Sequence, residues 1–346
     1  MNDHSLTQWL LEHGGPAIRY RTATELVDDP AGIDLQRLTE DLLQSAAVCQ
    51  WLDRIGLPGG LTALHGSPPG AFENVCAKLC ELGLRAGMLD ELDAKMEPFR
   101  RHLAGWDEKW GRTLLAACLN WIGYDDEAVL ACLSERLESM YGLARTGNYD
   151  IYVDQDTFGD FNNAFRKKPL INPDLNEPLP KIWDLYALAH WPAALRNDET
   201  QKKIDAIVAY ILHPGYQALE EGYGVMRAGK RRYYSMGWSV HLPGYDRSGR
   251  SIPDYIHVQR VELMAHFRTA RSSTWFQDRV RHLHGFQTTE GTYRFPSGYL
   301  HESSSGYWVT GAYMRLEENR RVRRSLDLDS TFRICLIENL ARGTSQ

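Results

Sequence analysis

Apolar residues recur at every third and fourth position over much of the chain, which is the pattern of amphipathic helices. The segments 5–13, 16–27 and 34–55 carry this pattern near the start, and Pro16 suits the first turn of its helix. Four further segments continue it after breaks of a few residues: 71–84, 88–103, 109–124 and 126–143. Loops this short join antiparallel neighbours, so the first part of the chain predicts a succession of helix pairs.

The periodicity stops between Ala144 and Pro180, where Asn, Asp and Pro are frequent. A segment of this length without regular structure is more often functional than idle in a compact chain. Helical patterns return at 181–191, 198–213, 255–269, 273–286 and 330–341. Strand signals are confined to YDIYV at 149–153 and TYRF at 292–295, each short enough for a hairpin beside a pocket.

Many helices of ten to twenty residues joined by short loops fit either a closed ring of paired helices or an open solenoid of repeats. No strict repeat is visible, and long aromatic insertions suit a ring whose loops gather at one mouth. We therefore expect one all-α domain over residues 1–346, an α/α toroid of paired antiparallel helices with one or two short β-hairpins near the pocket. Only the ends, residues 1–4 and 342–346, are expected to be disordered.

The composition and net charge of the chain limit the classes of partner that it is expected to bind. Hydrophobic residues make up 43% of the chain and charged residues 24%, as in ordinary globular proteins. The formal net charge of -6 argues against general binding to nucleic acid or anionic membranes. The first residues lack a basic leader with a long apolar run, and no window reaches the length of a membrane span, so a cytoplasmic protein is expected. The oligomeric state stays open.

The cysteine and histidine spacings do not predict a metal centre. Six scattered cysteines lie in apolar helical patterns, which favours buried free thiols. Cys76 and Cys80 lie four apart on one helix face, but no second pair stands at zinc-site spacing. Glu262 and His266, also four apart, are adjacent on one predicted helix, yet a hydrogen-bonded helix face is the favoured interpretation. We expect neither a metal nor a cofactor.

Several stretches carry a resemblance to a known superfamily: 9–30, 180–190, 231–245, 291–300 and 329–337. Through them nearly the whole chain resembles uncharacterised bacterial proteins related to squalene cyclases and prenyltransferase subunits, whose fold is the terpenoid cyclase-like toroid. Repeats of that superfamily end in a motif such as Q-x-x-D-G-x-W. Gln287, Glu290, Gly291 and Tyr293 form one degenerate copy of it.

The resemblance implies a catalytic acid motif. Class II terpene cyclases protonate an alkene with the middle Asp of a DxDD motif, and VDQDTF offers Asp154 and Asp156, with Thr157 where the third acid should stand. Their carbocations need a dry pocket with aromatic walls. The candidates for such walls are Trp183, Tyr233, Tyr234, Trp238, Tyr245, Tyr307 and Trp308. The zinc site of protein prenyltransferases has no counterpart, because no D-x-C pair occurs.

Carbohydrate chemistry is an alternative, since sugars bind aromatic platforms and are cleaved by pairs of carboxyl groups. Asp184, Glu302 and Asp154 could supply carboxylates, and Tyr234, His241 and His301 a base or proton donor. The segment from Gly222 to Tyr245 combines aromatic rings with the basic run at 230–232, and an arginine fork suits a carboxylate or phosphate.

The leading hypothesis is an enzyme that performs acid/base chemistry on a small organic molecule in an aromatic-lined pocket. The predicted catalytic residues are Asp154, Asp156, Tyr234 and His241. The predicted substrate-binding residues are Trp183, Asp184, Arg232, Tyr233, Trp238, Tyr245, His301, Glu302, Tyr307 and Trp308. A non-catalytic scaffold that presents a groove to a peptide or polysaccharide is the opposing hypothesis.

Overall fold

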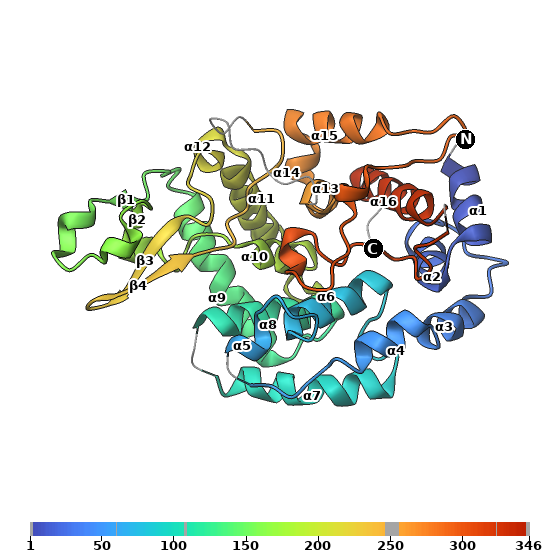
Figure 1. Ribbon diagram of the computed structural model, residues 1–346, viewed down its shortest axis with the longest axis horizontal. Coiled ribbons are helices and arrows are strands. Elements are labelled where there is room, and N and C mark those ends of the chain that lie inside the picture. The colour runs from blue at the N-terminus through green and yellow to red at the C-terminus, as the bar shows by residue number, and fades with distance from the viewer. Residues whose placement is uncertain (1–2, 60, 107–108, 246–255, 323, 344–346) are drawn as a thin grey trace.

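The computed structural model describes residues 3–59, 61–106, 109–245, 256–322 and 324–343. It is mostly helical, with one small four-stranded sheet at one end of the molecule (Figure 1). The helices are α1 (Asp3–His13), α2 (Pro16–Glu25), α3 (Leu35–Leu43), α4 (Ala46–Leu52), α5 (Leu61–Leu64), α6 (Phe72–Leu82), α7 (Asp90–Ala104), α8 (Lys109–Ile122), α9 (Glu127–Ala144), α10 (Ile182–Ala189), α11 (Asp198–Leu212), α12 (Pro214–Gln217), α13 (His257–Ala265), α14 (Arg268–Arg271), α15 (Thr274–His284) and α16 (Ser325–Arg342).

The helical periodicity of the sequence is confirmed, but two predicted helices are divided: the segment 255–269 into α13 and α14, and the segment 34–55 into α3 and α4. This segment splits into α3 and α4, because Ser45 takes an extended conformation and its hydroxyl accepts a hydrogen bond from Val48 N at 3.3 Å. A serine in this position satisfies a free amide at the start of a helix. At the ends of the chain, Asp3 already belongs to α1 and α16 continues to Arg342, while residues 1–2 and 344–346 lie outside the described part.

Six helices contact one another in sequence order: α2 contacts α6, α6 contacts α8, α8 contacts α10, α10 contacts α13, α13 contacts α16, and α16 contacts α2. Other helices lie against this set. Thus α1 packs on α2 and α16, α4 on α6, α7 on α8 and α9, and α11 on α9 and α14. One contiguous hydrophobic core runs through these helices.

The sheet contains β1 (Tyr152–Val153), β2 (Leu170–Ile171), β3 (Gly224–Gly229) and β4 (Arg232–Met236), in that order. β1 pairs with β2 and β3 with β4 in antiparallel fashion, whereas β2 and β3 are parallel. A separate small core, centred on Leu170, Val225 and Tyr233, holds the sheet together.

The strands differ partly from those expected. The segment 149–153 does supply β1, but 292–295 forms only an isolated bridge between Gln287 and Tyr293. The hairpin of β3 and β4 lies in the segment from Gly222 to Tyr245, which was not expected to form strands. Its tight turn places Arg231 at a φ of 58°, a conformation that sequence periodicity does not reveal.

Five of the six cysteines are buried and free, as expected, but Cys49 is exposed. None of the helices in the described part of the chain combines the length and apolar character needed to span a bilayer.

Candidate functional site

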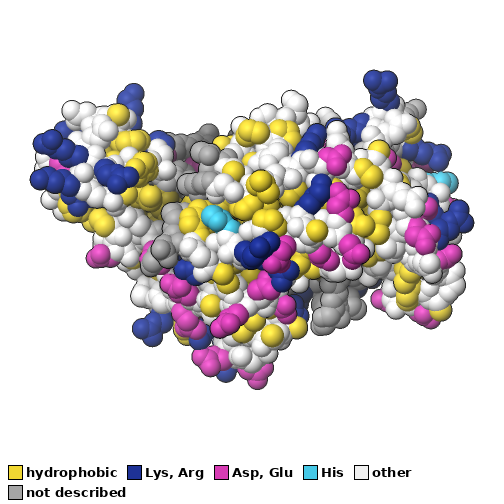
Figure 2. All heavy atoms as spheres, turned by 90° about the horizontal axis from the view of Figure 1, so that it is seen from below, with side chains coloured by type: hydrophobic (Ala, Val, Ile, Leu, Met, Phe, Trp, Pro, Cys, Tyr) yellow, Lys and Arg dark blue, Asp and Glu magenta, His cyan; other side chains and the backbone are white. Residues whose placement is uncertain are grey.

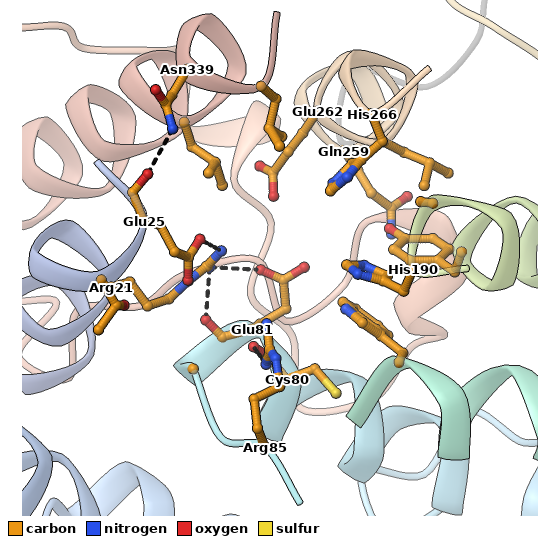
Figure 3. A pocket seen from close by; sticks show the side chains of 18 of the residues that line it. Arg21, Glu25, Cys80, Glu81, Arg85, His190, Gln259, Glu262, His266 and Asn339 are labelled. Carbon is orange, nitrogen blue, oxygen red and sulfur yellow. Dashed lines mark hydrogen bonds and ion pairs between the residues drawn. The ribbon is translucent and has the colours of Figure 1, made fainter. Parts of the chain in front are cut away.

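A polar cavity of about 510 Å³ lies where α2, α6, α8, α10, α13 and α16 meet (Figure 3). Each helix contributes residues from its later part, so their carboxyl ends gather around the cavity. The ionisable and amide side chains that line it are Arg21, Glu25, Glu81, Arg85, His190, Arg196, Gln201, Gln259, Glu262, His266, Arg271 and Asn339. In Figure 3 Glu81, Glu262, His190 and His266 point toward one open centre from different helices.

Arg333 is the cation beside two of these carboxylates. It lies in the middle of α16, fully buried, and its Nη1 is 2.7 Å from Glu81 Oε2 and 2.8 Å from Glu262 Oε1. Its Nη2 donates to Met314 O at 2.7 Å. One guanidinium group therefore forms ion pairs with two carboxylates from two different helices, α6 and α13.

Arg21 extends this network on the side of α2. Its Nε and Nη2 donate to the carboxylate of Glu25 at 2.7 and 2.8 Å, and its Nη1 lies 3.6 Å from Glu81 Oε2. Glu25, Glu81 and Glu262 line the cavity, and their side chains are only 11 to 14% exposed. Three carboxylates and two guanidinium groups thus leave an excess of one negative charge when all are ionised.

The pKa values of the two carboxyl groups beside Arg333 are shifted in opposite directions. Burial raises the pKa of Glu262 to about 7, against the lowering effect of Arg333. Burial also opposes ionisation of Glu81, but Arg333 and Arg21 outweigh it, and the pKa of Glu81 is lowered. Glu262 therefore carries the exchangeable proton while Glu81 stays ionised.

Two histidines line the same cavity with their ring centres 5.1 Å apart. Burial lowers the pKa of His266 to about 4. Burial, together with His266 and Arg85, lowers the pKa of His190 well below its usual range. Both imidazoles are neutral at pH 7, so they can accept or donate hydrogen bonds without adding charge.

Arginines surround the mouth of the cavity and bind the ends of its helices. Arg85 Nη1 donates to the carbonyls of Cys80 and Leu84, and Arg271 Nη1 donates to Leu340 O at 2.8 Å. These contacts satisfy carbonyl groups at helix carboxyl ends, where the helix dipoles are negative. The guanidinium groups also make the mouth attractive to an anionic group of a ligand.

Most of the predicted acid and relay residues lie far from this cavity, on the sheet. Asp154 and Asp156 are exposed, and Asp154 Oδ1 accepts from Asp156 N as the cap of a short 3-10 turn. Tyr234 is 44% exposed and its hydroxyl accepts from Arg232 at 3.0 Å, while the hydroxyl of Tyr233 donates to Asp160. Their catalytic and binding roles stay predictions.

The sheet also carries the densest basic surface. Figure 2 shows Lys and Arg side chains gathered at the end of the molecule that holds the sheet, whereas Asp and Glu side chains cover much of the helical part. The exposed basic residues here are Arg166, Lys167, Lys168, Lys230, Arg231 and Arg232.

Other predicted residues make structural contacts. Asp184 is buried, binds Arg136 through both carboxylate oxygens at 2.9 and 2.7 Å, and accepts from Lys181 N at 2.7 Å. His241 Nδ1 lies 2.7 Å from Ser239 Oγ. The hydroxyl of Tyr245 donates to Leu212 O. Asp184 thus joins α10 to α9, and none of these three predicted residues lines the cavity.

Three predicted aromatic residues meet around a histidine that the sequence did not single out. The ring of His65 lies 5.1 Å from Trp110, 6.0 Å from Trp183, 5.0 Å from Trp238 and 5.0 Å from Tyr307, centre to centre. Together with Glu73 these residues form a cluster that we term the aromatic box. Trp308 lies between the two places, since its ring packs against Trp121 and Tyr186 beside the cavity and it also points toward Glu73.

The predicted binding residues His301 and Glu302 lie on the same loop as Tyr307. His301 is exposed, and its backbone carbonyl accepts from Met314 N at 3.1 Å. Glu302 forms an ion pair with Arg320 at 2.8 Å and lies 3.6 Å from Lys78 Nζ. Glu302 therefore balances the buried ammonium of Lys78.

Sequence analysis missed Glu81, Arg333, His65 and Glu73. Each stands inside an apolar helical pattern or a proline-rich turn, and the charges that face one another come from helices far apart in the chain. Glu262 and His266 were noticed as helical neighbours, and both do line the cavity. Within the described ranges, no group of three or more His, Cys, Asp or Glu side chains is arranged to hold a metal ion.

Comparison with family models, with curated proteins and with solved structures found no match to this chain.

Proposed function

We propose that this protein is an enzyme that binds a small polar organic molecule in the cavity and performs acid/base chemistry on it through Glu262. The carrying observation is that Glu81 and Glu262 share Arg333 at the cavity wall, with one pKa lowered and the other raised to about 7. Two carboxyl groups held in different protonation states are the usual arrangement of a catalytic acid and its charged companion.

In this proposal Glu262 transfers the proton. A group whose pKa lies near the working pH is populated in both forms, so it can take a proton from one substrate atom and return it to another. Glu81 remains ionised and stabilises positive charge that develops nearby. His190 and His266, neutral and partly apolar, hydrogen-bond to the substrate and fix its orientation. Isomerisation and elimination reactions need such a set: a group that transfers a proton, a charge that stabilises the opposite charge, and groups that orient the substrate.

The substrate that fits best carries an anionic group. Arg85, Arg196 and Arg271 stand at the mouth of the cavity, and the first two also lower the pKa of His190 through their charge. A carboxylate or phosphate held there would leave the rest of a small molecule facing Glu262. This arrangement supports a polar substrate rather than an isoprenoid chain.

We further propose that the helices close into the α/α toroid expected from the sequence. The order of contacts, from α2 through α6, α8, α10 and α13 to α16 and back to α2, supports an inner ring, and the cavity lies at its carboxyl end. The helices α1, α4, α7, α9 and α11 would form the outer layer.

The terpene cyclase hypothesis and its acids, Asp154 and Asp156, can be tested separately. Both residues are exposed, so Asp156→Asn should leave stability unchanged. Loss of turnover in this variant would support the cyclase assignment. Unchanged turnover, combined with inactivity of Glu262→Gln, would support the cavity instead.

Carbohydrate chemistry is a second candidate, favoured by one observation. Oxygens of Glu81 and Glu262 lie within 2.8 Å of the same nitrogen, so the carboxyl groups are close enough for the paired action seen in retaining glycosidases. A neutral sugar would not need the arginines at the mouth. Equal binding of sugars and their phosphorylated or acidic forms would favour this candidate over the first.

The test is hydrogen exchange in deuterated water. Mixtures of small carboxylic and phosphorylated metabolites are incubated with the protein, and loss of carbon-bound hydrogen is followed by NMR. We expect exchange with the unaltered protein and none with Glu262→Gln. Glu317→Gln is the matched control, because burial also raises the pKa of Glu317 to about 7, yet Glu317 does not line the cavity. Exchange that persists in Glu262→Gln would contradict the proposal.

A further inference from the structure

The aromatic box lies at the opposite end of the same helices from the cavity. Glu73 is near the start of α6 and Glu81 near its end, a separation of about 12 Å along the helix at 1.5 Å per residue. Trp110 and Trp183 likewise stand at the starts of α8 and α10, whose later residues line the cavity. The box is therefore a separate place, and its function does not depend on Glu262.

Glu73 is a carboxyl group without a fixed cation. It is 0% exposed, and its Oε1 lies 2.6 Å from His65 Nδ1, although the direction of approach does not meet the geometry of a hydrogen bond. Gly66 N donates to the same oxygen at 3.2 Å. No Lys or Arg in the described part of the chain forms an ion pair with Glu73.

The second oxygen of Glu73 is not satisfied. Trp308 points toward the carboxyl group and lowers its pKa, against a larger rise caused by burial, but no described residue completes a hydrogen bond of normal geometry to Oε2. The indole nitrogen of Trp183, also in the box, is buried without a hydrogen-bond partner in the same residue ranges. Unsatisfied buried polar atoms call for a water molecule or a ligand.

The box gathers four aromatic rings around His65, the residue that contacts Glu73, and the face of such a ring is negative. A cation near such faces is stabilised by about 0.5 to 2 kcal/mol, more when water is excluded. Among the residues described, no Lys or Arg stands over the ring of Trp183, Trp238 or Tyr307. Among the described residues, Glu73 has no counter-ion that is always charged, because His65 carries a charge only when it is protonated.

Trp238 is held in place at an energetic cost. Its φ of 73° is in the left-handed region, which costs about 1 to 2 kcal/mol for a residue with a side chain. Its carbonyl accepts from Ile182 N at 2.9 Å, which fixes it to the start of α10. Strain in a bulky residue is typical of binding sites that are preformed.

We propose that the aromatic box binds a small organic ammonium ion. With the Nδ1 proton of His65 directed to Glu73, Nε2 is left as an acceptor for an ammonium N–H. The His65 side chain remains 16% exposed. The alkyl part of the ligand lies against Trp238 and Tyr307, which are both partly exposed.

The test compares cyclohexylammonium with cyclohexanol at pH 7.5, since the two probes have the same ring but differ in charge. Binding is followed by tryptophan fluorescence and isothermal titration calorimetry. We expect the ammonium ion to bind at least tenfold more tightly than the alcohol. Glu73→Gln should abolish this preference while the alcohol still binds, because the shape of the box is kept and its charge is lost.

Two control variants and one back-up make the result decisive. Glu302→Gln and Glu262→Gln should keep the full preference, because neither residue belongs to the box. If Glu73→Gln does not fold, Tyr307→Leu replaces it and should weaken ammonium binding about tenfold. Equal affinity for the two probes, a preference that survives Glu73→Gln, or no binding of either probe would overturn the proposal.

Discussion

Arg333 places one nitrogen, Nη1, within 2.9 Å of both carboxylate oxygens of Glu262. The same nitrogen also reaches Glu81, so removing this guanidinium group leaves two buried carboxyl groups without their counter-charge. This relationship ties α16 to α6 and α13 and makes Arg333 the residue on which the cavity depends most.

Arg333→Met should therefore lower the free energy of unfolding by about 3 to 5 kcal/mol, the usual effect of removing one partner of a buried ion pair. The loss should be larger at pH 8 than at pH 5, where the carboxyl groups can be protonated. Chemical denaturation at the two pH values measures both effects. Arg320→Met is the matched control, because the Arg320 side chain is 49% exposed and Glu302 keeps Lys78 as a partner, so its loss should change stability by less than about 1 kcal/mol.

Stability should also report the protonation of Glu262. Its pKa in the folded state, about 7, is above the ordinary value of 4.5, so the folded state binds the proton more tightly. The resulting stabilisation is complete below pH 4.5 and is lost as the pH rises to 7, by up to about 3 kcal/mol. Unfolding curves between pH 5 and 8 should be flatter for Glu262→Gln than for the unaltered protein.

The variants must be compared because the titration of His266 changes stability with pH in the direction opposite to that of Glu262. Its pKa of about 4 lies below the ordinary 6.5, so its contribution to stability is present above pH 6.5 and is lost as the pH falls. Glu317→Gln should remove a slope of the same sign as that of Glu262. Identical slopes for the unaltered protein and Glu262→Gln would show that Glu262 is ionised throughout this range.

Asp184 should behave as a structural residue rather than a substrate ligand. Asp184→Asn leaves Arg136 buried without its charged partner and should destabilise the protein by about 3 to 5 kcal/mol. Ligand binding to the remaining folded protein should be unchanged. Weaker binding with normal stability would instead restore the substrate-binding role predicted from the sequence. Asp205→Asn, which breaks an exposed pair with Arg268, serves as the control with a smaller expected loss.

The turn between β3 and β4 offers a stabilising change. Arg231 has a φ of 58°, which glycine adopts without strain, and only its backbone N donates, to Asp160. Arg231→Gly should raise the free energy of unfolding of the sheet by up to about 1 kcal/mol. Lys230→Gly, at a neighbouring position without a positive φ, should lower it slightly. Hydrogen exchange of the strand amides can detect both changes.

The helices could be predicted because their burial follows the chain locally. Residues such as Leu38, Leu42, Val48 and Trp51 recur at helical spacing and are all buried, so the pattern carries its own evidence. The hairpin of β3 and β4 was missed because its stability comes from pairing between strands and from the small core around Tyr233. Neither is visible in a local period.

The aromatic box and the cavity could each be predicted only in part. Trp183, Trp238 and Tyr307 were chosen as aromatic candidates and do come together, because long loops rich in such rings pack at helix ends. Glu81 and Arg333 lie about 250 residues apart in the sequence. Each looks like a single charged residue within an apolar helical pattern. Only the three-dimensional contact between α6 and α16 turns them into a pair, so no local pattern could identify them.

The position of Arg333 in α16 also sets the order in which this fold can be completed. Ribosomes deliver α6 and α13, with Glu81 and Glu262, long before they deliver the helix that neutralises both. Until α16 docks, those carboxyl groups must stay hydrated or protonated, so the centre of the molecule cannot dry early in synthesis. Docking of the last described helix is therefore the step that seals the interior, and the newborn chain remains open to water until then.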